Sequence, residues 1–203
     1  MSSKVVVKQE VAKEGDSPAA ATRQSFLHPE GLFEGDPEAS AVLWSCVRTR
    51  PRWEKKLAEW LRGRGRTYFL PVFRHATVSG RKRRVSELPL FPGFVFVAGD
   101  SAKKDFAQTG SVAYVLHPRG PQEAAQLHRE LRNIWRGLTA GVYVSPVRNL
   151  AVGEMCRIIH GPLQGVEAKF ERMGREGRLI LQVEMMGGGI AVEVAADEVE
   201  VSS

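Results

Sequence analysis

The sequence lacks the features that mark membrane proteins and secreted disulfide scaffolds. It has only two cysteines in 203 residues, Cys46 and Cys156, which are too few to staple a fold and are typical of the reducing cytosol. Every apolar run falls well short of the roughly 20 residues that span a bilayer. The run at residues 5–7 is also too short for the apolar core of a secretory signal. We therefore expect a cytoplasmic protein that does not enter a membrane.

The chain also lacks the patterns of catalytic and metal sites. Its five histidines never fall at the i, i+4 spacing by which a helix presents a metal-binding pair. Residues 63–68 share two glycines with a dinucleotide-binding loop, but the third glycine is missing, so we interpret them as a turn that ends a helix. Both cysteines fall in predicted strands, where a buried, unreactive thiol is expected. The sequence thus predicts no enzymatic activity, no catalytic residue, no metal and no cofactor.

Positive charge, by contrast, is abundant and unevenly placed. Lys and Arg number 29 against 23 Asp and Glu, which gives a net charge of +6. Residues 1–40 carry 4 basic and 7 acidic side chains (net −3), residues 41–147 carry 19 and 7 (net +12), and residues 148–203 carry 6 and 9 (net −3). A middle segment this basic attracts a phosphate backbone or another acidic surface. The alternative is a solvated face that uses Arg for solubility.

The first 40 residues show neither helical nor strand periodicity. Proline and glycine recur through them, and their apolar residues are too scattered to build a core. We expect a disordered leader over residues 1–40, with a short apolar patch at residues 26–33.

Residues 41–138 alternate strand-like and helix-like patterns and form one predicted domain. Apolar residues recur at helical spacing at Trp53, Leu57, Trp60 and Leu61. Pro121 stands where a helix favours a proline in its first turn, ahead of a second such stripe. Strands are predicted at residues 41–47, 68–73, 90–97 and 112–116. This order predicts an α+β fold, in which an antiparallel or mixed sheet is covered by helices.

After a predicted linker at residues 139–150, the pattern changes to short strands separated by turn residues. Five strands are predicted between residues 155 and 201, and a small closed β-barrel over residues 151–203 buries them best. Residues 179–195 are predicted to be strand and not helix, because residues 190–194 alternate at period two and Gly187 to Gly189 would break a helix.

Two motifs, in this order, resemble one known family. The first comprises the stretch from Trp44 to Lys56, the tripeptide Phe69-Leu-Pro71, the basic turn Arg81-Lys-Arg-Arg84 and the strand Pro89-Leu-Phe-Pro-Gly-Phe-Val-Phe-Val97. The second runs from Val152 to Ala168 and is similar to a KOW motif, with Gly161, Pro162 and Gly165 at its turn. Together they resemble the NusG family of transcription elongation and antitermination factors, and specialised paralogues of the RfaH and UpxY type in particular.

The resemblance implies a fold, partners and an interface. The N-terminal domain would be the ferredoxin-like NGN domain, and the C-terminal one an SH3-like KOW barrel. In this family the NGN domain docks on the clamp coiled coil of RNA polymerase, and by motif position Phe91, Phe94 and Phe96 are the residues expected there. The alternative for each of these aromatics is the core beneath the helices.

The resemblance also implies contact with non-template or upstream DNA. Phosphate contacts are expected from the basic residues Arg48, Arg50, Arg52, Arg74, Arg81, Lys82, Arg83 and Arg84. Base contacts are expected from Gln108, Thr109 and Ser111. The alternative for these last three is an ordinary polar helix end.

These implications favour a monomeric transcription elongation or antitermination factor that binds RNA polymerase and suppresses pausing or termination, with a dedicated operon as its target. Its KOW domain would contact either Rho or a small-subunit ribosomal protein. The competing interpretation is a ribosome- or RNA-associated KOW-domain protein that uses its basic middle domain on RNA.

Overall fold

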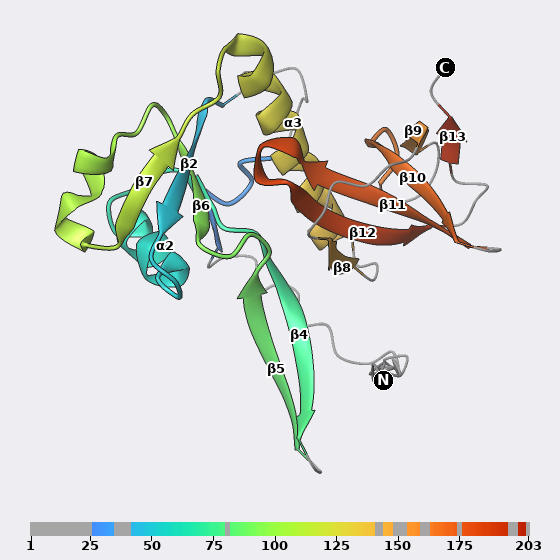
Figure 1. The fold of residues 1–203 in the computed structure, drawn as a ribbon, viewed down its shortest axis with the longest axis horizontal. Helices are drawn as coiled ribbons and strands as arrows, with labels where there is room; N and C mark the ends of the chain where they lie inside the picture. Colours follow the sequence, from blue (N-terminus) through green and yellow to red (C-terminus); the bar gives the residue numbers. More distant parts are fainter. Residues whose placement is uncertain are drawn as a thin grey trace, which may run out of the picture.

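In the described residues, a five-stranded sheet and three helices make up the core of the N-terminal part of the fold (Figure 1). The computed structural model describes residues 26–34, 42–79, 82–140, 144–147, 154–158, 163–173, 176–194 and 199–201. The sheet has the order β1-β3-β6-β2-β7. Its strands are β1 (Leu27–His28), β2 (Trp44–Thr49), β3 (Tyr68–Phe69), β6 (Phe94–Ala98) and β7 (Val112–Leu116). All its pairings are antiparallel.

Alternation along the two central strands gives the sheet two apolar faces. Val47 and Val95 lie opposite each other and are fully buried on the face that packs with α2 (Glu54–Arg62) and η1 (Lys103–Thr109). Cys46 and Phe96 form the next pair and are buried on the other face, toward α3 (Pro121–Thr139). The expected α+β architecture, a sheet covered by helices, is present, and the helices lie on both faces of the sheet.

The predicted helix ends are also present. Gly63 closes α2 by donating its N–H to the carbonyl of Glu59, and Gly65 adopts φ +62 in the turn that follows. Glycine enters this left-handed region without a steric penalty because it has no Cβ, so it is the residue that suits this turn. Pro121 is the first residue of α3.

The residues expected to form a leader contribute to the core. Leu27 and Phe33 are 6% and 3% exposed, and β1 extends the sheet by pairing with β3. The expectation that the apolar residues before position 40 are too scattered to build a core is therefore wrong for residues 26–34. These residues form no periodic element of their own, and they are ordered by contacts with strands and a helix far away in the sequence.

A long hairpin projects from the domain as a separate two-stranded sheet (Figure 1). It consists of β4 (Val72–Ser79) and β5 (Lys82–Pro89). A free-standing two-stranded hairpin is only marginally stable in water. At its base, the ammonium of Lys55 lies 3.9 Å from the carboxylate of Glu87, which ties the hairpin to α2.

The C-terminal strands form one open sheet. Its order is β13-β9-β10-β11-β12-β8, with strands β8 (Val144–Val147), β9 (Glu154–Ile158), β10 (Glu167–Met173), β11 (Glu176–Val183), β12 (Gly188–Val194) and β13 (Val199–Val201). Within the described residues the outer strands β8 and β13 do not pair with each other, so the closed barrel that we expected is not seen. The prediction of strand over residues 179–194 is confirmed for β11 and β12, which are joined by the short helix η2 (Glu184–Met186).

Part of the expected linker is a strand, and part of the KOW turn lies within the described residues. Residues 144–147 were expected in the linker but pair with β12 as an edge strand, a position in which Pro146 is tolerated. Of the KOW turn, Gly165 adopts φ +80, whereas Gly161 and Pro162 lie outside the described residues.

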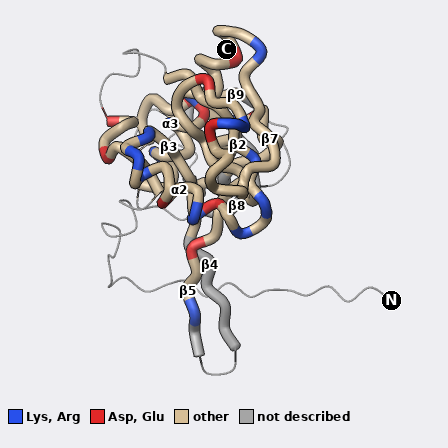
Figure 2. The backbone as a smooth tube through the Cα atoms, turned by 90° about the vertical axis from the view of Figure 1, so that its left-hand side faces the viewer, with Lys and Arg blue, Asp and Glu red and all other residues tan. Residues whose placement is uncertain are grey.

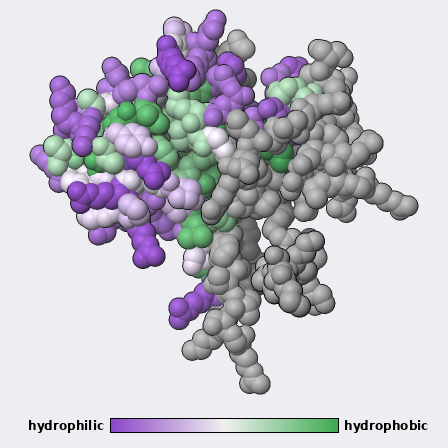
Figure 3. Space-filling view, in the orientation of Figure 1, coloured by the Kyte–Doolittle hydropathy of each residue, from purple (hydrophilic) through white to green (hydrophobic). Residues whose placement is uncertain are grey.

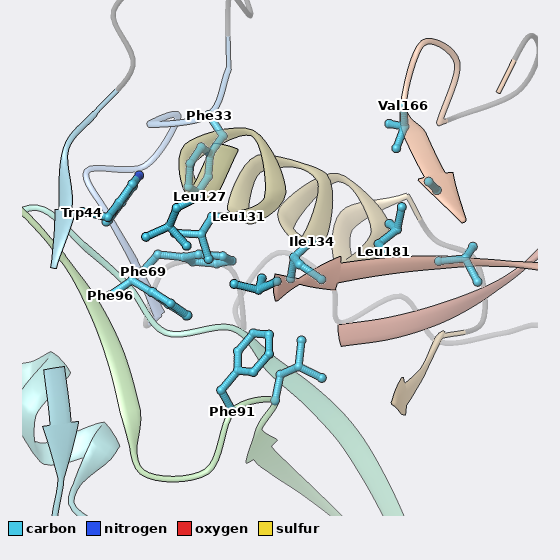
Figure 4. Close-up of a cluster of buried hydrophobic side chains, with 14 of the residues drawn as sticks. Phe33, Trp44, Phe69, Phe91, Phe96, Leu127, Leu131, Ile134, Val166 and Leu181 are labelled. Atoms are coloured by element: carbon cyan, nitrogen blue, oxygen red, sulfur yellow. The ribbon is translucent and has the colours of Figure 1, made fainter. Parts of the chain in front are cut away.

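Helix α3 packs against both sheets through one buried stripe of its surface (Figure 4). Leu127, Leu131 and Ile134 are each at most 1% exposed and share one core with Phe96 of the N-terminal sheet and Leu181 of the C-terminal sheet. Polar contacts add to this packing, since the amide of Gln126 donates to Glu184 and the guanidinium of Arg136 donates to the carbonyl of Gln164. No helix in the described part of the chain is long and apolar enough to cross a membrane.

Candidate protein- and nucleic-acid-binding surfaces

Two of the three aromatics expected to dock a partner belong to the core. Phe96 is fully buried and Phe91 is 6% exposed, and their rings meet edge to face at 5.6 Å. Phe94 is half-buried, and the guanidinium of Arg48 lies 4.7 Å above its ring. Of the expected set, Phe94 is thus the member that reaches the surface in this conformation.

The face that carries Phe94 continues onto β7 as an exposed apolar strip. Arg48 lies opposite both Phe94 and Tyr114, and Cys46 lies opposite both Phe96 and Leu116, so these side chains share one face. Tyr114 is 47% exposed and Leu116 is 37% exposed. Figure 3 shows a hydrophobic area on this side of the domain, over β2 and β7. We define the docking strip as Phe94, Tyr114 and Leu116.

Sequence reasoning missed Tyr114 and Leu116. They lie two residues apart on a strand that was correctly predicted, so they had to share one face of it. Helix α3 packs over the part of this face around Cys46 and Phe96 and leaves β7 open. The sequence could not show this, because it depends on β7 being the edge strand of the sheet.

The C-terminal sheet covers the inner end of the same face. The thiol of Cys46 lies 3.4 Å from the sulfur of Met185, which belongs to the connection between β11 and β12. Burial raises the pKa of Cys46 to about 12, and the carboxylates of Glu123 and Glu130 add to this shift. Cys46 is therefore an unreactive thiol while the two sheets remain together.

Three arginines lie at the end of β2 and on the loop that follows it, which we call the arginine loop: Arg48, Arg50 and Arg52. Arg48 donates to the carbonyl of Pro92 at 2.9 Å. The next residue, Gly93, adopts φ +84, a conformation that favours glycine. Arg50 and Arg52 are exposed. The buried carboxylate of Glu54 accepts the Gly93 N–H at 2.6 Å and fixes the neighbouring loop.

The three residues expected to contact bases are mostly engaged within the protein. Gln108 accepts a hydrogen bond from the guanidinium of Arg64 at 2.8 Å. The hydroxyl of Thr109 donates to the carbonyl of Phe106 and accepts from the hydroxyl of Ser111 at 2.7 Å. Ser111 is 1% exposed. This loop nevertheless adjoins the arginine loop, because the N–H of Arg50 donates to the carbonyl of Ser111 at 2.8 Å.

The remaining basic residues belong to the projecting hairpin. Arg74 pairs with Glu87 in its register and Arg84 with Thr77, and Arg84 is exposed. Lys82 and Arg83 lie near the tip of β5, whereas Arg81 lies outside the described residues. The basic residues are thus spread over several ends of the domain and do not form one patch (Figure 2).

A histidine on α3 is part of the structural core and not of a reactive site. The indole N–H of Trp44 donates to Nδ1 of His128 at 3.0 Å, and the ring of Phe33 lies 5.9 Å from that of His128. Burial lowers the pKa of His128, and Arg132 and Arg129 lower it further, so the neutral ring that accepts this bond is favoured. No group of three or more potential metal ligands occurs among the described residues.

The fold and these surfaces define a protein with a helix-covered α+β domain that offers basic loops and an apolar strip for binding. A comparison with known families matches residues 43–135, from β2 to most of α3, to the family described as "Transcription termination factor nusG". Residues 43–135 thus form a NusG-family domain, and this family consists of non-enzymatic transcription factors. No curated protein matches the chain.

Proposed function

We propose that this protein is a transcription elongation or antitermination factor that binds RNA polymerase through the docking strip. The observation that carries the proposal is the exposed apolar strip on the part of the chain that matches the family. An exposed aromatic and two apolar neighbours beside a cation suit the tip of a helical coiled coil, which buries apolar side chains and offers carboxylates at its rim. The clamp coiled coil of the polymerase is the proposed partner.

The C-terminal sheet would regulate access to this face. Met185 lies on Cys46, so the apolar surface beyond the strip is occupied while the two sheets are packed together. We propose that departure of the C-terminal sheet completes the docking surface and frees that sheet for a partner of its own, either Rho or a small-subunit ribosomal protein.

The arginine loop and the hairpin would hold non-template or upstream DNA. Contacts from Arg48, Arg50, Arg52 and the hairpin cations to phosphates add affinity without sequence preference. A factor that binds the polymerase clamp and the DNA together has a higher affinity for the closed clamp than for the open one, and by this difference it suppresses pausing.

Capture of RNA polymerase tests the docking strip. In the full-length protein, we expect Tyr114→Ala with Leu116→Ser to weaken binding to core RNA polymerase at least tenfold, because two exposed anchors are lost. Met155→Ala removes an equally exposed apolar side chain (46%) from the C-terminal sheet and is the matched control. Equal binding by the double variant and the wild type would refute the proposal. Capture of ribosomes in place of polymerase would favour the ribosome-associated alternative.

The salt dependence of DNA binding tests the hairpin. Replacing Arg81, Lys82, Arg83 and Arg84 with alanine should weaken binding to every duplex sequence. It should also flatten the plot of log affinity against log salt by about 0.9 for each phosphate contact removed. Arg119→Ala with Arg129→Ala, two exposed arginines before and on α3, should leave the slope unchanged. A loss confined to particular sequences would show base recognition and contradict the proposed phosphate contacts.

A further inference from the structure

The turn that ends α2 holds three arginines in alternation with two glycines. Arg62, Arg64 and Arg66 leave the helix within one tight turn, in which the N–H groups of Arg64 and Arg66 both donate to the carbonyl of Leu61 at 3.0 Å. No atom lies within 4 Å of the position that a Cβ on Gly65 would take, so the turn is open to solvent on that side. The helix-stop turn thus also gathers three cations.

The middle arginine is held in place in a defined orientation. The guanidinium carbon of Arg64 lies 3.8 Å from the ring centre of Trp60, and one of its N–H groups donates to the side-chain oxygen of Gln108. The side chain is nevertheless exposed. A guanidinium stacked on an aromatic ring is a pre-organised surface for phosphates and for the flat face of a base.

Two lysines from a different element complete the cluster. Lys103 and Lys104 begin η1, are exposed, and make no hydrogen bond or ion pair with the described residues. The guanidinium of Arg66 donates to the hydroxyl of Ser101 at 2.9 Å, which brings the start of η1 beside the arginine turn. Trp60 and Phe106 also pack together, with ring centres 6.2 Å apart.

The acidic groups nearby are few and mostly engaged elsewhere. The carboxylate of Asp105 accepts the N–H of Ala102 at 2.8 Å, and that of Asp100 lies 3.5 Å from the ring of His117. Glu59 is exposed one turn earlier on α2. The five basic side chains therefore outnumber three carboxylates, two of which already have partners.

This cluster lies at the opposite end of α2 from the arginine loop. The nine residues of α2 span about 13 Å, from Glu54 beside Gly93 to Arg62 beside the start of η1. The two basic ends are joined along one side of the domain, because Gln108 contacts Arg64 and the neighbouring Ser111 contacts Arg50. Helix η1 and the loop after it thus connect the two basic ends of α2.

We propose that the cluster Arg62, Arg64, Arg66, Lys103 and Lys104 is a second nucleic-acid site, which binds a single strand. Phosphates lie on the exposed arginines and lysines, and one base stacks on the exposed guanidinium of Arg64. A single strand is the class that fits, because a duplex offers no unstacked base to a flat guanidinium. Gln108 then acts as a positioning residue for Arg64.

Binding of oligonucleotides to the full-length protein, followed by fluorescence anisotropy, tests the site. A 12-nucleotide single-stranded RNA and the matching DNA are the probes. At about 0.1 M salt, each phosphate contact to a single strand contributes a factor of about 5 to the affinity. The variant Lys103→Ala with Lys104→Ala loses two such contacts, so it should bind about 25-fold more weakly. The slope of log affinity against log salt should become shallower by about 1.4. Arg119→Ala with Arg129→Ala is the charge-matched control.

Arg64→Lys separates stacking from charge. It keeps the cation but loses the planar stack on Trp60, so we expect weaker binding at an unchanged salt slope.

Weakening for RNA alone or for DNA alone identifies the strand that is bound, and either result supports the site. The proposal would be overturned if the double lysine variant bound oligonucleotides with wild-type affinity, or if the control lost as much affinity. It would also be overturned if the protein bound polyglutamate but no oligonucleotide, and the lysine substitutions weakened that polyglutamate binding. Polymerase capture by the lysine variant should remain at the wild-type level, so failure here is distinguishable from failure of the docking strip.

Discussion

Replacing Phe33 with alanine is expected to cost about 3–5 kcal/mol of folding free energy, although this residue lies in a segment that we expected to be a leader. Phe33 is 3% exposed and contacts aromatic rings from three elements: Trp44 at 5.8 Å, Phe69 at 5.2 Å, and both His128 and Trp135 at 5.9 Å. Truncation leaves a cavity between the sheet and α3 that these rigid rings cannot fill.

Urea denaturation followed by tryptophan fluorescence measures this cost. Glu34→Ala, which changes an exposed neighbour of Phe33, should alter the stability by less than about 0.5 kcal/mol. A cost below about 1 kcal/mol for Phe33→Ala would show that residues 26–34 do not hold α3 to the sheet. A fragment that begins at residue 41 lacks this contact, so an N-terminal fragment for binding studies should begin at or before residue 26.

Gly189→Ala is expected to destabilise the C-terminal sheet by about 3 kcal/mol or more. A Cβ at this position would overlap the carbonyl oxygen of Leu181 and lie 2.6 Å from the Cα of Gln182. Both atoms belong to the backbone of the neighbouring strand, so no side-chain rotation relieves the clash, and β11 and β12 must separate there.

The readout is the reactivity of Cys46 toward a maleimide. Separation of β11 from β12 moves Met185 away from Cys46, so we expect Cys46 to react faster in the variant than in the wild type. Gly187→Asn is the control, because Gly187 adopts φ +64 in open space and asparagine tolerates this conformation. Equal labelling of Cys46 in Gly189→Ala and in the wild type would contradict the packing of the two sheets.

The central strands and both long helices were predictable because their signals are local. The alternation around Val95 and Phe96 indicated a strand with two apolar faces, and the stripe that includes Leu57 and Leu61 indicated α2. Pro121 and Gly63 marked helix ends through backbone chemistry that does not depend on the rest of the fold.

The contributions that sequence reasoning missed depend on long-range contacts. Phe33 is buried because residues far along the chain surround it, and β8 exists because β12 lies beside it. The site was predicted only in part for the same reason. The family motif led to Phe94, but whether Phe91 or Phe96 is exposed depends on how α3 and the C-terminal sheet pack over them.

Site-specific photo-cross-linking to RNA polymerase tests the central claim most directly. With a photoreactive phenylalanine analogue at position 114 of the full-length protein, we expect a cross-link to the polymerase subunit that carries the clamp coiled coil. The same analogue at position 155, which is equally exposed on the C-terminal sheet, should give none to that coiled coil. Cross-links from position 155 to the clamp and none from position 114 would show that the docking strip is not the polymerase-binding surface.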